Sequence, residues 1–456
     1  MKKFIVLAAA ALSLSSCGLY TQYKPQSEVE KDLYGEQLSS SKDTTSIANI
    51  SWREFFTDRQ LQTLIDEALK NNTNLLSAQS KVESAQAALR SARLTYLPSL
   101  SLQPNATVSG FVESGGKASQ SYQLPAVASW EIDIFGRIRN SKLSSQMAYA
   151  QSKDYQQAVK TQLVASVANL YYTLLMLDAQ LEITQATEKS WQQSVEAAES
   201  MKRAGLMNEA GVAQMKSAHL QTQNAVISIK TQIALSQNAL CSILSSTPHQ
   251  IQRGTLAEQQ FTQSLAVGVP LQVLSHRPDV RAAEMSLAQA YYSTNIARSA
   301  LYPSISLSGL VGWTNTATGV VVNPADLIYS VTGSLVQPIF NKGLNRAQLE
   351  IAKNSFEQSR LSFQQTLLDA GREVNDAMTS YQASLSKSPI YERQIEELEV
   401  ARKSTSLLMT HGSTTYLEVL SAKQSLLAAR LESVANRVEQ IQNLITLYNA
   451  LGGGRF

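Results

Sequence analysis

The sequence predicts an α+β fold in which one unit of helix, β-hairpin, long helix and helix occurs twice. Residues 137–204 contain no glycine or proline, and a second helical stretch of the same 68-residue length covers 344–411. Segments that alternate apolar and polar residues, as strands do, precede both stretches. Pro98-Ser99-Leu100 recurs 205 residues later as Pro303-Ser304-Ile305. A helix of that length spans roughly 100 Å, far more than a globular core needs.

The first 16 residues are predicted to be a targeting segment. Two lysines precede the apolar run Phe4–Leu14, and Leu14-Ser15-Ser16-Cys17 resembles a bacterial lipobox. This pattern predicts a lipoprotein signal peptide over 1–16 and lipidation of Cys17. The alternative is an ordinary signal peptide with an incidental cysteine. Gly18, where an aspartate would resemble an inner-membrane retention signal, favours the outer membrane.

Composition excludes several classes of function. Charged residues make up 16% of the 456, and loss of the signal with its two lysines leaves 37 basic against 36 acidic residues. The sequence has no run of basic residues that would indicate nucleic-acid binding. With Cys17 acylated, Cys241 has no disulfide partner and is expected to be a small core residue. No apolar run after the signal reaches the ~20 residues of a transmembrane helix, so a membrane crossing is expected to use strands.

The predicted organisation follows these patterns along the chain. It comprises an acylated linker (17–50), a first repeat (51–246) with a hairpin at about 98–135 and a long helix at about 137–204, a connection (247–269), a second repeat (270–451) with a hairpin at about 303–340 and a long helix at about 344–411, and a tail (452–456) ending in Phe456. Pro104 and Pro125 are expected at bulges or strand ends. Gly371 and Pro389 predict a bend or break in the second long helix. In the last helix an apolar stripe runs through Leu417, Leu420, Leu427, Leu431, Val434, Val438, Ile441, Ile445 and Tyr448, interrupted only by Gln424.

Four strands of roughly 12–14 residues are long enough to cross a bilayer when tilted. Four strands cannot close a barrel, and an open edge in lipid would leave backbone groups unpaired. The sequence therefore predicts an α+β membrane protein that associates to complete its sheet, without fixing the copy number. The alternative is a solid coiled-coil bundle that acts as a tether, and the two hairpins argue against it.

Seven motifs carry a family resemblance over nearly the whole mature chain. They are Trp52-Arg-Glu-Phe-Phe-Thr-Asp58, Tyr96-Leu-Pro-Ser-Leu100, Trp130-Glu-Ile-Asp-Ile-Phe-Gly-Arg137, Val269-Pro-Leu-Gln-Val-Leu-Ser-His-Arg-Pro-Asp-Val280, Leu301-Tyr-Pro-Ser-Ile-Ser-Leu-Ser-Gly309, Gln337-Pro-Ile-Phe340 and Tyr416-Leu-Glu-Val-Leu-Ser-Ala422. In this order the chain resembles a TolC-type outer membrane factor, of the acylated OprM/NodT-like branch that serves multidrug efflux.

The resemblance implies a homotrimer with a 12-stranded β-barrel, continued through the periplasm by an α-helical barrel. It implies a periplasmic adaptor (membrane fusion) protein and an inner-membrane resistance-nodulation-division pump as partners. The protein would be a passive duct for small molecules, anchored in outer-membrane lipid, with no enzyme activity and no cofactor. The alternatives are the exit duct of a protein-exporting system and a tether without a pore. Histidines 219, 249, 276 and 411 are scattered without metal-ligand spacing.

The candidate site lies where each long helix turns back. The resemblance places adaptor-contacting tips at Gly205, Leu206, Met207, Gly412, Ser413 and Thr414. It places a carboxylate of the tunnel entrance at Glu418, with Glu209 as a second candidate. Ser421 stands where the family usually has aspartate, and Thr414 replaces a basic residue of some members. We therefore expect one ring of three Glu418 carboxylates, and the alternative is a solvated surface charge. Arg277-Pro278-Asp279 is expected to start a helix.

Overall fold

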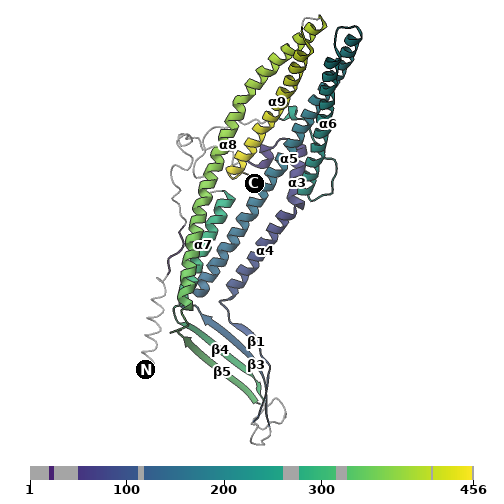
Figure 1. Ribbon diagram of the computed structural model, residues 1–456. Helices are drawn as coiled ribbons and strands as arrows, with labels where there is room; N and C mark the ends of the chain where they lie inside the picture. Colours follow the sequence, from purple (N-terminus) through teal and green to yellow (C-terminus); the bar gives the residue numbers. More distant parts are fainter. Residues whose placement is uncertain are drawn as a thin grey trace. The chain divides into compact units, whose positions relative to one another are not determined.

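The computed structural model describes residues 20–24, 50–110, 118–259, 277–314, 326–411 and 414–453. Cys17, the signal peptide, nearly all of the linker, most of both hairpin loops, Gly412, Ser413 and Phe456 lie outside these residues. In chain order the elements are α2 (Trp52–Phe55), α3 (Arg59–Asn71), α4 (Thr73–Leu94), β1 (Ser99–Leu102), β2 (Asn105–Ser109), β3 (Ser119–Ile132), α5 (Arg137–Arg203), α6 (Glu209–Ile243), the 3₁₀ turn η3 (Leu256–Glu258), α7 (Pro278–Ser299), β4 (Ser304–Thr314), β5 (Asp326–Val336), α8 (Leu344–Thr410) and α9 (Tyr416–Ala450) (Figure 1).

The chain divides into two compact units. The strand unit falls within Met1–Glu28, Ser80–Asp154 and Arg281–Thr366, and the helix unit within Val29–Gln79, Tyr155–Val280 and Leu367–Phe456. Helices α4, α5, α7 and α8 contribute residues to both units. The two halves of the chain match in element length, since α5 and α8 each have 67 residues and α6 and α9 each have 35.

The strands form one antiparallel sheet in the order β1–β3–β4–β5, with β2 also paired to β3. Pro104 lies between β1 and β2 and so marks a strand end, because proline cannot donate to the ladder. Pro125 lies inside β3, opposite Gly312 of β4 in a continuous register, so the bulge or strand end expected there is wrong. A Cβ on Gly312 would lie 2.4 Å from the Cα of Pro125, so this pair requires glycine.

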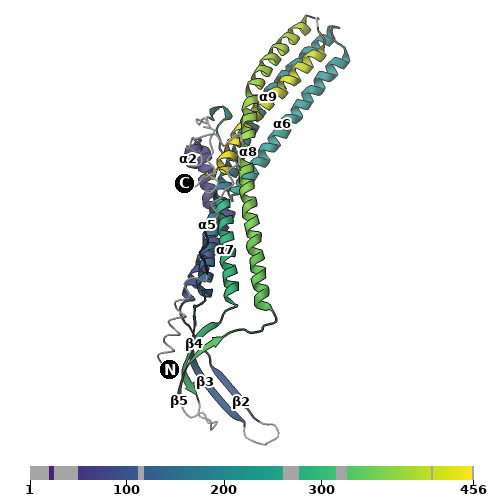
Figure 2. The ribbon, with the colours of Figure 1, turned by 90° about the vertical axis from the view of Figure 1, so that its left-hand side faces the viewer.

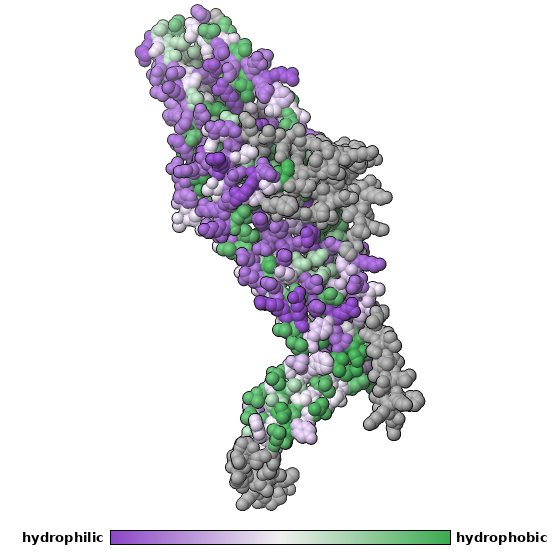
Figure 3. All heavy atoms as spheres, turned by 180° about the vertical axis from the view of Figure 1, so that it is seen from behind, coloured by the Kyte–Doolittle hydropathy of each residue, from purple (hydrophilic) through white to green (hydrophobic). Residues whose placement is uncertain are grey.

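The strand register gives the sheet two unlike faces. The exposed large apolar residues of one face are Leu100, Leu102, Val108, Tyr122, Leu124, Trp130, Ile132, Leu307, Val311, Trp313, Leu327, Tyr329, Val331 and Leu335. Figure 3 shows hydrophobic residues gathered over the strands and hydrophilic residues over the helices. The opposite face is mostly hydroxyl-bearing, with Ser129 opposite Ser308 and Ser308 opposite Thr332. The sheet is therefore amphipathic across its width.

The start of α5 is fixed by the residues that follow β3. The Asp133 carboxylate accepts hydrogen bonds from the backbone N–H groups of Ile138 and Arg139, at 2.9 and 2.7 Å. A carboxylate at this end of a helix satisfies free N–H groups and is favoured by the helix dipole. Gly136 supplies the left-handed φ of +70° that the turn requires.

Helix α8 corrects one expectation. The structure has a single helix over Leu344–Thr410 with Pro389 inside it, so of the bend or break expected at Gly371 and Pro389 the break is wrong, and the bend stays a prediction. Packing against α9 on both sides of the proline explains the continuity. In the preceding turn the carbonyl of Ser384 accepts hydrogen bonds from Asn436 and Gln440 of α9, at 3.1 and 3.2 Å. These contacts help to keep α8 helical despite the hydrogen bond that proline removes.

The core of the helix unit is built from α3, α5, α6 and α9. On α5 the buried face includes Leu163, Val167 and Leu174, at helical spacing. Figures 1 and 2 show α5 beside α6 and α8 beside α9, each pair an antiparallel hairpin. Among the described residues, no helix combines the length and the apolar character that a membrane span requires.

Candidate channel surfaces at the sheet and the helical tip

The sheet ends in two strand edges that nothing in the described chain covers. In that part of the structure β5 pairs only with β4, and β1 and β2 pair only with β3. The outer N–H and C=O groups of these strands have no ladder partner among the described strands. In hydrocarbon each such group would cost several kcal/mol. An apolar face with two open edges is thus an incomplete membrane-facing surface.

The first helical turn-back, between α5 and α6, is built by its own sequence. The N–H of Leu206 bonds to the carbonyl of Met201, and that of Gly205 to the carbonyl of Lys202. Gly205 has φ +75°, so this is a Schellman C-cap. The Asn208 side chain then accepts from Gly211 N–H at 2.9 Å and begins α6.

A small apolar cluster packs the two turn-backs together. It is formed by Ala198, Val212, Met215, Met409 and Val419, with Val195, Met201, Met207 and Tyr416 against it. A Cβ on Gly211 would lie 3.0 Å from the Tyr416 ring, so the first turn of α6 approaches that of α9 closely. We call this region the helical tip.

The predicted site residues lie at this tip, each in its own surroundings. Glu418 is exposed and accepts a hydrogen bond from the Thr414 hydroxyl, and Ser421 is exposed one turn further along α9. Glu209 is exposed and forms an ion pair with Lys202. Leu206 is 75% exposed, whereas Met207 packs against the tip cluster.

One buried tip residue was missed by sequence reasoning. The predicted stripe on α9 is wrong at its tip end, where Leu417 is exposed and the buried positions are Val419, Ala422, Lys423 and Leu426. Lys423 was not identified as buried from the sequence, because a lysine in a helix normally marks the solvent side. The available signal was its spacing of four and three from Val419 and Leu426.

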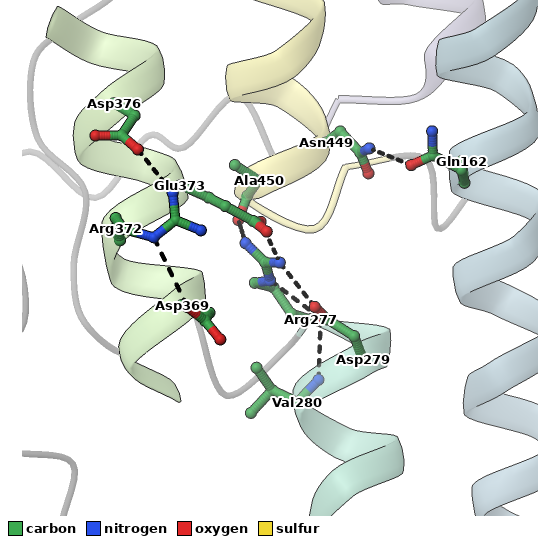
Figure 4. A network of polar contacts seen from close by, with 10 residues as sticks. All are labelled: Gln162, Arg277, Asp279, Val280, Asp369, Arg372, Glu373, Asp376, Asn449 and Ala450. Carbon is green, nitrogen blue, oxygen red and sulfur yellow. Dashed lines mark hydrogen bonds and ion pairs between the residues drawn. The ribbon is translucent and has the colours of Figure 1, made fainter. Parts of the chain in front are cut away.

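The Arg277-Pro278-Asp279 motif starts a helix, as expected, because Pro278 is the first residue of α7. Figure 4 shows that Arg277 also ties three helices together. Its guanidinium bonds to both carboxylate oxygens of Asp279, to Glu373 of α8 and to the carbonyl of Ala450 on α9. Burial favours the protonated form of Asp279, but the hydrogen bonds and charge of Arg277 outweigh it and hold the pKa of this carboxyl below its ordinary value.

Comparison with known proteins decides what these surfaces belong to. The profile of the outer membrane efflux protein family matches residues 64–246 and 269–453, which is most of both repeats. The chain belongs to this family. It is an outer membrane protein with the fold of TolC-type channels, and not an enzyme.

The relatives found match this chain over nearly its full length. The cation efflux system protein CusC of Escherichia coli strain K12 is 30% identical over 446 residues, 97% of this chain and 98% of that protein. The solvent efflux pump outer membrane protein SrpC of Pseudomonas putida is 28% identical over 455 residues, 98% of this chain and 97% of that protein. The open-state crystal structure of the Neisseria gonorrhoeae MtrE outer membrane channel has a TM-score of 0.82 and 27% identity, covering 95% of this chain and 98% of that chain.

Proposed function

We propose that this protein is the outer membrane channel of a tripartite efflux system, a passive trimeric duct that carries small molecules unchanged to the outside. The observation that carries the proposal is the sheet, with its apolar face, its hydroxyl-rich opposite face and its two open edges. The apolar face would meet lipid and the hydroxyl face would line a water-filled lumen. In this proposal Cys17 carries the lipid anchor.

The chain's own repeat suggests how copies join. Within one chain, Ser129 of β3 pairs with Ser308 of β4. Shifting each by the 205-residue repeat gives Ser334 of β5 and Gln103 of the β1–β2 segment. The open edge of β5 would thus pair with the open edge of β1 and β2 in the next copy. Three copies would close the sheet.

The proposed partners dock at the helical tip. A periplasmic adaptor would contact Gly205, Leu206, Met207, Gly412, Ser413 and Thr414, beneath which an inner-membrane pump of the resistance-nodulation-division type would lie. The exposed Leu206 supports this role. Three copies of Glu418 would form the carboxylate ring at the entrance, with Ser421 one turn beyond and Glu209 engaged by Lys202.

The relatives suggest two classes of cargo. SrpC belongs to a solvent efflux pump and CusC to a cation efflux system. We propose small organic molecules as the main cargo, with cations as the second candidate because of the 30% identity to CusC.

Susceptibility of a deletion strain to hydrophobic drugs, solvents and metal salts tests this choice. Increased sensitivity to organic compounds supports the main proposal, and sensitivity confined to metal salts supports the second. Planar-bilayer recording separates a duct from a tether: purified trimer without conductance, even with a mutated tip, would contradict the channel. A deletion that stops secretion of a protein while drug sensitivity is unchanged would favour a protein-export duct.

A further inference from the structure

Lys423 is a buried cation in the contact between α9 and α5. Its residue surface is 7% exposed. The ammonium donates to the backbone carbonyl of Ser190 at 3.1 Å, to the Ser190 hydroxyl at 3.0 Å and to the Ser194 hydroxyl. It also lies 4.9 Å from the ring centre of Trp191. All of these acceptors are uncharged, and within the described residues Lys423 forms no ion pair.

The two helical hairpins that meet at this contact, α5–α6 and α8–α9, are each joined internally by ion pairs. In α5–α6, Lys216 pairs with Glu199 at 2.7 Å, and Lys202 pairs with Glu209. In α8–α9, Arg430 pairs with Glu399 at 2.6 Å. The α5–α9 contact, which we call the seam, instead uses neutral groups besides Lys423. Gln180 donates to the Leu431 carbonyl at 3.4 Å, and Gln442 donates to the Thr173 hydroxyl at 3.2 Å.

The charge of Lys423 therefore opposes the packing that surrounds it. Burial of an ammonium without a counter-charge is unfavourable, since serine hydroxyls and an indole ring replace only part of its hydration. The pKa of Lys423 is lowered to about 8 by desolvation and by the nearby charge of Arg402. At neutral pH the group is still largely charged, so water entering the seam would relieve this cost. Replacement of Lys423 by methionine, which has a similar length and is apolar, would remove the cost of burying this charge.

We propose that Lys423 is a release element, whose hydration favours separation of α9 from α5 and so sets how readily the helical tip opens. This inference rests on the proposed channel function and concerns its regulation. Ion pairs join the two helices within each hairpin, whereas the contacts named above across the seam are neutral apart from Lys423, and the seam is the contact that yields. In this arrangement the lysine weakens a contact that apolar residues alone would hold more tightly.

Two sets of variants with opposite expected effects test the proposal. Lys423→Met should slow amide hydrogen exchange in peptides covering 186–197 and 418–428 by at least roughly tenfold, because the buried charge is gone. It should also lower single-channel conductance and the entry of a glycopeptide antibiotic through the duct. Ser190→Ala with Ser194→Ala should accelerate exchange by roughly tenfold and raise conductance, because the ammonium loses its two hydroxyl acceptors and keeps only the Ser190 carbonyl. Lys230→Met on the exposed side of α6 is the matched control and should change neither readout.

The outcomes separate this inference from the proposed function. Faster exchange and higher conductance in Lys423→Met would show that the lysine clasps the seam shut and would overturn the proposal, as would no change in either readout. If wild-type trimer conducts nothing, the channel function fails, while the exchange measurement still decides the release element. If Lys423→Met does not assemble, Lys423→Gln, which keeps a polar side chain without the charge, takes its place, and unchanged or faster exchange there overturns the proposal.

Discussion

The sheet and the helical tip meet the same problem, a surface incomplete within one chain, in different ways. The sheet exposes an apolar face and two strand edges, and no side chain of its own can satisfy them. The tip closes on itself through a small apolar cluster, a Schellman cap and local ion pairs. The difference teaches that assembly is obligatory at the sheet, whereas the tip is adjustable. Substitutions should therefore abolish function at the sheet and tune it at the tip.

The largest expected effect is at Gly312. Gly312→Val would place a Cβ 2.4 Å from the Pro125 Cα and force β3 and β4 apart. We expect a loss of at least about 4 kcal/mol of stability, because backbone cannot shift as a flexible side chain can. The measurement is the yield of folded trimer that resists unfolding in SDS at room temperature. Gly309→Val, where a Cβ would contact nothing within 4 Å, is the control; equal yields of the two variants would contradict the tight pairing.

The next effect compares the two faces of β5. Val331→Lys introduces a charge at an apolar-face position that is 75% exposed. We expect destabilisation by about 2–4 kcal/mol if this position is near the bilayer midplane. Ser330→Lys, on the opposite face, should be almost neutral because it meets water in the lumen. Urea unfolding of trimer refolded in liposomes measures both, and equal losses would show that the faces are not distinguished by lipid.

At the tip, Glu418→Ala should reduce cation preference and change single-channel conductance by roughly twofold without affecting trimer yield. The reason is that the proposed entrance would lose three carboxylates, each of which has a hydroxyl partner but, among the described residues, no cation. Glu209→Ala should have a smaller effect, since Lys202 already neutralises that carboxylate. Unchanged conductance and ion selectivity in Glu418→Ala would leave Glu418 as a solvated surface charge.

The smallest effect is a dependence of opening on pH. The pKa of Lys423 is about 8 in the packed seam, below the ordinary lysine value of about 10.4 that a separated, hydrated seam would restore. Between these values the separated state binds more protons, so raising the pH favours the packed state. Of the charged groups in the described chain, Arg402 acts on this lysine and stays protonated throughout. Open probability should fall from pH 7 to pH 9, and Lys423→Met should lose that dependence; a rise with pH in the wild type would contradict the sign.

Much of this fold follows from sequence periodicity. Absence of glycine and proline over 137–204 predicted a helix that the structure has over Arg137–Arg203. Alternation predicted the strands, and the observed register shows that they share two unlike faces. Pro389 misled because proline costs a hydrogen bond locally, whereas the packing of α8 on α9 extends to both sides of it. Sequence periodicity carries no information about the strength of this packing between two helices.

The site was less predictable for a related reason. Glu418 and Glu209 could be placed at the tip by their spacing from Gly412 and Gly205, but their partners Thr414 and Lys202 depend on local rotamers. Lys423 could not be found from residue type, because its burial reflects the rotation of α9 about its axis. A shift of one position exposes Leu417 and buries Lys423.

The most direct test of the central claim, that copies of this chain complete one another's sheet, is a disulfide between strand edges. In a Cys241→Ser background, Ser334→Cys with Gln103→Cys should cross-link into covalent dimers and trimers on an oxidised, denaturing gel. Ser129→Cys with Ser308→Cys should instead form a bond within one chain, because these residues pair inside it. A ladder that ends at the trimer is the predicted result. Monomer alone from the edge pair, under conditions in which the internal pair oxidises fully, would contradict the account.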